Sequence, residues 1–186
     1  MRRIWFIFVL ALFFSGCKNT ADGMDGVLRL RRQIMQTQAS SFLCEISADY
    51  GQEVYQFQMN CNFDEKGSMQ FIVQQPESIS GISGNIDNDG GKLIFDDDSL
   101  AFPLLADGYL SPISSPWVFM KTLRSGYLES CQPIDGGYCI IAKDSFQDKP
   151  LQLEIYTDMQ FTPQSADFLW DGRRILSINI DQFQCM

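Results

Sequence analysis

Apolar and polar side chains alternate along two successive runs of the sequence, residues 41–50 and 55–63. Alternation with a period of two is typical of strands that bury one face and expose the other. We therefore predict a long β-hairpin whose tip is Gln52-Glu53. In that register the apolar positions of both runs share one face, and Cys44 lies directly opposite Cys61.

The rest of the sequence predicts further antiparallel strands and two helices. An aspartate can cap a helix over residues 24–39, and Ser115-Pro116 begins a shorter one over 116–125. We expect an α+β fold in which roughly ten antiparallel strands, in meander order, form one curved sheet. This sheet would be an open half-barrel with the two helices covering its concave face. The later strands are expected at 69–73, 78–86, 93–95, 100–102, 127–131, 138–143, 151–157, 164–170 and 174–184.

The N-terminus has the organisation of an export signal. Two arginines precede an uninterrupted apolar run over residues 4–14, and Ser15-Gly16 then places small residues before Cys17. The run is shorter than the roughly 20 residues that cross a bilayer. The pattern resembles a lipobox, so we predict a signal peptide over 1–16 and a lipid anchor on Cys17. A short tether over 17–23 would lead to a single domain spanning 24–186. The alternative is an ordinary signal peptide that leaves Cys17 as a thiol.

These segments place the protein outside the cytoplasm, attached by lipid to the cell membrane. Arg29, Arg31 and Arg32 follow the predicted tether. They could contact anionic lipid headgroups, or they could simply form a solvated helix face. Removing residues 1–16 deletes two arginines and no acid, so the mature chain carries 12 − 23 = −11. That charge argues against nucleic acid as a partner.

The composition also argues against catalysis and metal binding. The chain has no histidine, which removes the commonest general base and a common zinc ligand. Asp87, Asp89 and Asp98 are spaced like the ligands of a calcium loop, but Lys92 stands where that loop needs glycine. Two polar turns account better for these aspartates. We predict no cofactor, no metal site and no enzymatic activity.

Cysteines other than Cys17 are compatible with disulfide bonds, because exported proteins meet oxidising conditions. The hairpin register predicts a Cys44–Cys61 bond. Cys131 and Cys139 bracket a loop rich in proline and glycine, and we predict a second bond between them. Cys185 is then left over. The alternative is that all these cysteines are small apolar residues of the core.

The closing stretch of the sequence resembles a known family. Phe161-Thr162-Pro163, then residues 166–172 and 178–183, follow the order of elements of the LolA/LolB-type lipoprotein-carrier superfamily. The lipidated germination lipoproteins of spore-forming clostridia are the branch that it resembles in particular. The resemblance implies an open half-barrel with helices in its mouth. Carrier members bind acyl chains there, whereas germination-type members bind and support a peptidoglycan-cutting amidase.

The helix over 116–125 carries the candidate binding residues. If it lies in the mouth of the half-barrel, an apolar groove would be lined by Trp117, Phe119, Met120 and Leu123. The alternative is that these side chains belong to the core. Two functions follow for the chain: docking an envelope, spore-wall or peptidoglycan-processing protein as a non-enzymatic module, or carrying lipid or lipoprotein acyl chains in the groove.

Overall fold

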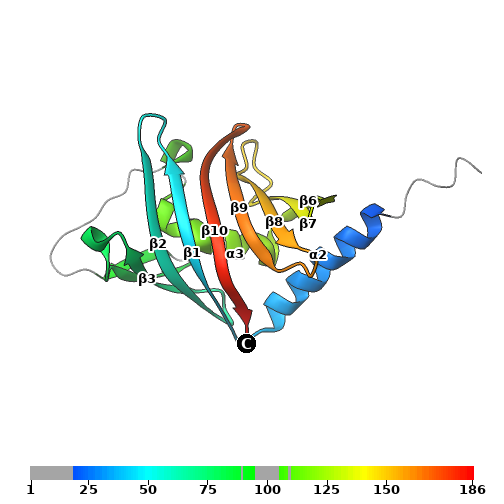
Figure 1. The fold of residues 1–186 in the computed structure, drawn as a ribbon, viewed down its shortest axis with the longest axis horizontal. Coiled ribbons are helices and arrows are strands. Elements are labelled where there is room, and N and C mark those ends of the chain that lie inside the picture. Colours follow the sequence, from blue (N-terminus) through cyan, green and yellow to red (C-terminus); the bar gives the residue numbers. More distant parts are fainter. Residues whose placement is uncertain (1–18, 89, 95–104, 109) are drawn as a thin grey trace, which may run out of the picture.

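The computed structural model describes residues 19–88, 90–94, 105–108 and 110–186. The predicted signal peptide, the anchor at Cys17, the strand over 100–102, and Asp89 and Asp98 of the calcium-like spacing lie outside this part of the chain. The described residues form one α+β unit, a curved antiparallel sheet with helices on its concave side (Figure 1).

The sheet contains ten described strands in the order β5-β4-β3-β2-β1-β10-β9-β8-β7-β6. It therefore consists of two five-strand meanders joined where β1 pairs with β10. The expectation of a simple meander was wrong at this point. Pairing the first strand with the last removes two exposed edges from the centre of the sheet. The strands are β1 (Ala39–Asp49), β2 (Val54–Asp64), β3 (Met69–Gln75), β4 (Ser83–Asp87), β5 (Gly90–Ile94), β6 (Tyr127–Ile134), β7 (Gly137–Lys143), β8 (Gln152–Asp158), β9 (Pro163–Trp170) and β10 (Arg173–Cys185).

Two α-helices and three short 3₁₀ segments complete the described chain. Helix α2 (Asn19–Gln36) begins earlier than the expected residue 24, so residues 19–23 of the predicted tether are helical. Helix α3 (Ser115–Ser125) matches the predicted one, with proline in its first turn and Gly126 directly after it. The expected strand over 78–86 is replaced at its start by a 3₁₀ turn, because Gly81 turns the chain with a φ of 89° before β4. The 3₁₀ segments are η2 (Glu77–Ile79), η3 (Ala106–Gly108) and η4 (Pro112–Ser114).

The predicted register of the first hairpin was wrong by two residues. Cys44 pairs with Met59, and Phe42 pairs with Cys61. The tip lies at Gly51-Gln52 because Gly51 takes a φ of 88°, which favours glycine at a tight turn. A shift of two residues keeps every side chain on its predicted face, so the core of the hairpin is unchanged.

The core lies between the concave face of the sheet and the two helices. Inward positions of the strands are buried and apolar, as in β1, where Phe42, Ile46 and Ala48 are at most 3% exposed. The Phe42 ring contacts Phe119 of α3 edge-on, with centroids 6.0 Å apart. Such contacts add to the area buried and fix the helix against the sheet.

Candidate functional site

Helix α3 fills the concave face of the half-barrel. Phe119, Met120 and Leu123 are 0%, 1% and 1% exposed, so they belong to the core. The structure thus brings three of the four predicted groove residues together, but as a packed layer against the sheet. A packed layer of this kind leaves no space for a ligand chain beside these three side chains.

Trp117 has a different position from the other three predicted groove residues. Its indole N–H donates a hydrogen bond to the carbonyl of Gly67, with Nε1 and O 3.1 Å apart. The Nζ of Lys121 lies 4.6 Å from the centre of its ring, within the range of a cation–π contact. Trp117 is half-buried and joins α3 to the turn between β2 and β3.

Arg31 of α2 holds the C-terminal end of α3. Its guanidinium donates to the carbonyls of Leu123 (2.6 Å), Gly126 (2.8 Å) and Thr122 (3.2 Å). The last carbonyls of a helix have no partner within it, and a cation there also complements the helix dipole. Burial lowers the pKa of Arg31 from its usual value. Arg31 is therefore directed inward, although the sequence suggested that it could contact lipid.

Helix α2 is held at a second point, where Gly26 meets the turn between β8 and β9. A Cβ atom built on Gly26 would overlap the Phe161 ring, so only glycine permits this approach. Phe161 in turn stacks on Tyr138, with ring centroids 4.3 Å apart and planes 14° apart. A cavity of about 410 Å³ lies beside this contact, lined in part by Arg29, Gln33, Met159 and Phe183.

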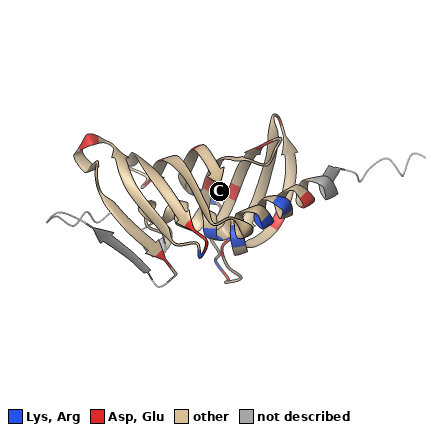
Figure 2. Ribbon diagram, turned by 90° about the horizontal axis from the view of Figure 1, so that it is seen from below, with Lys and Arg blue, Asp and Glu red and all other residues tan. Residues whose placement is uncertain are grey.

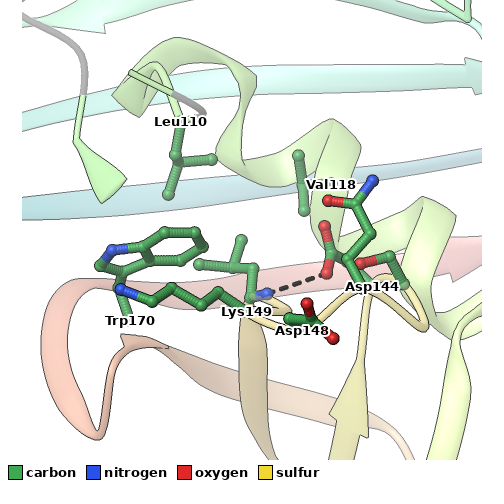
Figure 3. A pocket seen from close by; sticks show the side chains of 9 residues that line it. Leu110, Val118, Asp144, Asp148, Lys149 and Trp170 are labelled. Carbon is green, nitrogen blue, oxygen red and sulfur yellow. Dashed lines mark hydrogen bonds between the residues drawn. The ribbon is translucent and has the colours of Figure 1, made fainter. Parts of the chain in front are cut away.

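A larger cavity of about 530 Å³ is lined by the β7–β8 loop and by Val118 of α3. The β7–β8 loop lies at the top of Figure 1. Trp170 and Leu110 stand on one side, and Asp144 and Asp148 on the other, with Lys149 at the margin (Figure 3). The Leu151 N–H donates to Asp144 Oδ1 at 2.9 Å, which shapes the loop. An apolar floor with a few charged groups at its margin is typical of a site that recognises another molecule.

An exposed aromatic pair adjoins this cavity. Phe146 is 87% exposed although its neighbours Ser145 and Gln147 line the cavity, and Tyr127 is 47% exposed. Their ring centroids lie 5.3 Å apart. The distal surface, as we call the set of Tyr127, Phe146, the β7–β8 loop and Trp170, was missed by sequence reasoning. The one sequence feature that could have indicated the distal surface is Phe146, an aromatic residue in an otherwise polar loop.

The convex face carries a group of titratable side chains on β7, β8 and β9. Glu154 and Asp167 lie directly opposite each other on β8 and β9. Burial, followed by the Glu154 charge, raises the pKa of Tyr156 to about 12. Burial, with Glu154 and Asp167, also raises the pKa of the Cys139 thiol. A raised pKa lowers the fraction of thiolate, which is the nucleophilic form of cysteine.

Two cysteines of the core also have raised pKa values. Burial raises the pKa of Cys61 well above its usual value and that of Cys131 to about 11. Among residues 19–186, as far as the structure describes them, no group of three or more acidic or cysteine side chains is placed to bind a metal ion. None of the helices in the described ranges is both long enough and apolar enough to cross a bilayer.

The two predicted disulfides differ in geometry. The Sγ atoms of Cys44 and Cys61 lie 3.8 Å apart in the core without a bond between them, so this disulfide stays a prediction. Cys131 pairs with Ile140, not with Cys139. Because adjacent strand positions point to opposite faces, Cys131 lies inside and Cys139 outside, which does not favour the second bond. Cys185 is also a free thiol.

Comparison with known proteins finds similarities of fold only. No protein-family model and no curated protein matches the sequence. The structure is similar to a LolA superfamily protein, NE2245 from Nitrosomonas europaea, with 8% identity, 88% of this chain and 93% of that chain covered, and a TM-score of 0.46. LprF from Mycobacterium bovis has 8% identity, coverage of 89% and 94%, and a TM-score of 0.39. The MucA/MucB complex of Pseudomonas aeruginosa has 12% identity, coverage of 88% and 56%, and a TM-score of 0.41.

Proposed function

We propose that this protein is a lipid-anchored, extracytoplasmic and non-enzymatic module that docks a partner protein of the cell envelope. The observation that carries the proposal is the filled concave face. Phe119, Met120 and Leu123 occupy the place where a carrier would hold an acyl chain. An acyl chain would have to displace α3, whose end is tied to α2 by the hydrogen bonds of Arg31.

The anchor supports docking at a fixed place. Cys17 precedes the start of α2 at Asn19 by two residues, which span about 7 Å when extended. A domain attached so closely to a bilayer suits a protein that collects or supports a partner at the membrane. A shuttle between membranes would gain nothing from such an anchor.

The distal surface is the proposed docking site. Phe146 is 87% exposed and Tyr127 lies beside it, and aromatic side chains dominate the energetics of protein interfaces. Asp148 and Lys149 at the cavity margin would fix the orientation of the partner. The resemblance to germination lipoproteins suggests a peptidoglycan-processing enzyme as the partner.

A photo-crosslinking residue placed at Gln147 tests the proposal in native membranes. We expect one discrete crosslinked product, and we expect Phe146→Ser to reduce it at least about tenfold, as removal of a hot-spot side chain does. The control is Ile72→Ser on β3, an inner strand in the other half of the sheet, where a 40% exposed apolar side chain is removed from another surface. Equal losses with both variants, or no discrete product at Gln147, would contradict docking at the distal surface.

A further inference from the structure

Helix α2 has two faces of different character. Val27, Leu30 and Ile34 are 1%, 7% and 0% exposed and pack into the core. On the other side Leu28 is 44% and Met35 is 58% exposed. Positions 28, 32 and 35 fall on one side of a helix, so these two apolar side chains flank Arg32.

The exposed face of α2 is basic on an acidic protein. The chain has a net charge of −9, yet Arg29 and Arg32 are both exposed on this helix, with Asp25 near its start. Figure 2 shows the molecule from below, and the basic residues of α2 are coloured blue along the helix in this view. Arg31, directed inward, does not contribute to this face.

Two further exposed methionines lie close to α2. Met159 is 57% exposed and lines the same cavity as Arg29. Met186 is 66% exposed, and its carbonyl accepts the Thr37 hydroxyl (3.2 Å) directly after α2 ends. Flexible methionines beside arginines are suited to a surface that is irregular and anionic.

We propose that this face of α2, with Leu28, Arg29, Arg32 and Met35, lies on the anionic phospholipids of the membrane that holds the anchor. This inference rests on the proposed anchor at Cys17 and specifies how the anchored domain is oriented. An anchor two residues before α2 keeps the helix at the lipid surface, so even weak contacts become populated. A helix with arginines and exposed apolar residues on one face has the composition of an interfacial helix.

The contact would orient the whole domain. Helix α2 is fixed to α3 through Arg31 and to the β8–β9 turn through Gly26 and Phe161. Because α2 runs along the lower right of Figure 1 and the β7–β8 loop lies at the top, the distal surface would lie on a different side of the domain from the bilayer. Each arginine near an anionic surface shifts the equilibrium by about fivefold, so Arg29 and Arg32 together would favour the bound orientation about 25-fold.

Arginine footprinting of the full lipidated protein tests this orientation. The protein is placed on vesicles of phosphatidylcholine, or of equal parts phosphatidylcholine and phosphatidylglycerol, and treated with phenylglyoxal. We expect labelling of Arg29 and Arg32 to be at least about fivefold slower on the anionic vesicles. Arg173 and Arg174, whose side chains are 62% and 65% exposed at the other end of the sheet, are the internal controls and should be labelled at equal rates.

A charge variant tests whether the arginines cause the contact. Peroxide oxidation of Met35 should be slower on the anionic vesicles in the natural protein, and equal on both vesicles in Arg29→Gln/Arg32→Gln. Equal labelling of Arg29 and Arg32 on both vesicles, with the protein still bound to them, would overturn the α2 surface and leave the anchor standing. Protection of Met35 that persists in the double variant would overturn the role of charge. Failure of the protein to float with either vesicle would overturn the anchor and this inference together.

Discussion

Replacing Arg31 by methionine tests how the two helices are held in the half-barrel. The guanidinium makes two short hydrogen bonds, to Leu123 O at 2.6 Å and to Gly126 O at 2.8 Å, and a longer one to Thr122 O. Hydrogen bonds to a charged group contribute about 1.5–3 kcal/mol each, and a carbonyl left without a partner costs about 1–3 kcal/mol when buried. Because Arg31 is only partly buried, we expect Arg31→Met to lower the free energy of unfolding by about 3 kcal/mol in total. Methionine keeps the apolar stem of the side chain.

Thermal unfolding followed by circular dichroism measures this loss. For a chain of this size 3 kcal/mol corresponds to a fall in Tm of roughly 6–12 °C. The matched control is Arg32→Met, one position away on the exposed side of the same helix, for which we expect a change within about 0.5 kcal/mol. Equal Tm values for Arg31→Met and Arg32→Met would contradict this account, because α3 would then be held by packing alone.

Three further variants probe the same packing and the convex face. Gly26→Ala should destabilise the protein by about 2 kcal/mol in urea unfolding, because the new Cβ meets the Phe161 ring. Helix propensity alone would make the Gly26→Ala variant more stable than the natural protein, so a gain in stability would contradict the close contact. Phe119→Ala should cost about 4 kcal/mol and open a site for an apolar dye, and a loss under about 1 kcal/mol would show that the concave face is not filled. The raised pKa of Tyr156, about 12, means that its contribution to stability is present below pH 10 and is lost as pH rises toward 12. Tyr156→Phe should therefore flatten the fall in stability between pH 10 and 12, and an unchanged slope would refute that assignment.

Much of the fold could be predicted because its signals are local. Alternation identified β1 and β2, and Ser115-Pro116 followed by Gly126 placed α3 within one residue of its start. Asp171-Gly172, a dipeptide typical of hairpin turns, joins β9 to β10, and both residues take positive φ, 53° and 75°. Each of these signals depends on neighbouring residues only.

Features that depend on distant residues could not be predicted. The hairpin register was predicted from the match of apolar positions together with Cys44 opposite Cys61, whereas Gly51 at the turn determines it. The pairing of β1 with β10 joins the two ends of the chain, and no local pattern specifies it. The inward direction of Arg31 depends on where α3 ends, 91 to 95 residues away.

The predicted groove on α3 stays a prediction, and the structure shows that three of its four residues are buried in the core. Sequence alone cannot distinguish an apolar side chain that lines an empty groove from one that fills it. Phe119, Met120 and Leu123 fill it. The distal surface was missed because Phe146 and Trp170 lie in separate segments that only the folded sheet brings to one end.

Native mass spectrometry of residues 19–186, purified without detergent, tests the central claim most directly. That claim is that α3 fills the half-barrel and that the protein is a docking module, with no lipid cargo inside. We predict the mass of the bare polypeptide. An additional mass that organic solvent extracts, and that Phe119→Trp reduces by crowding the interior, would contradict the claim and assign the concave face to a carrier.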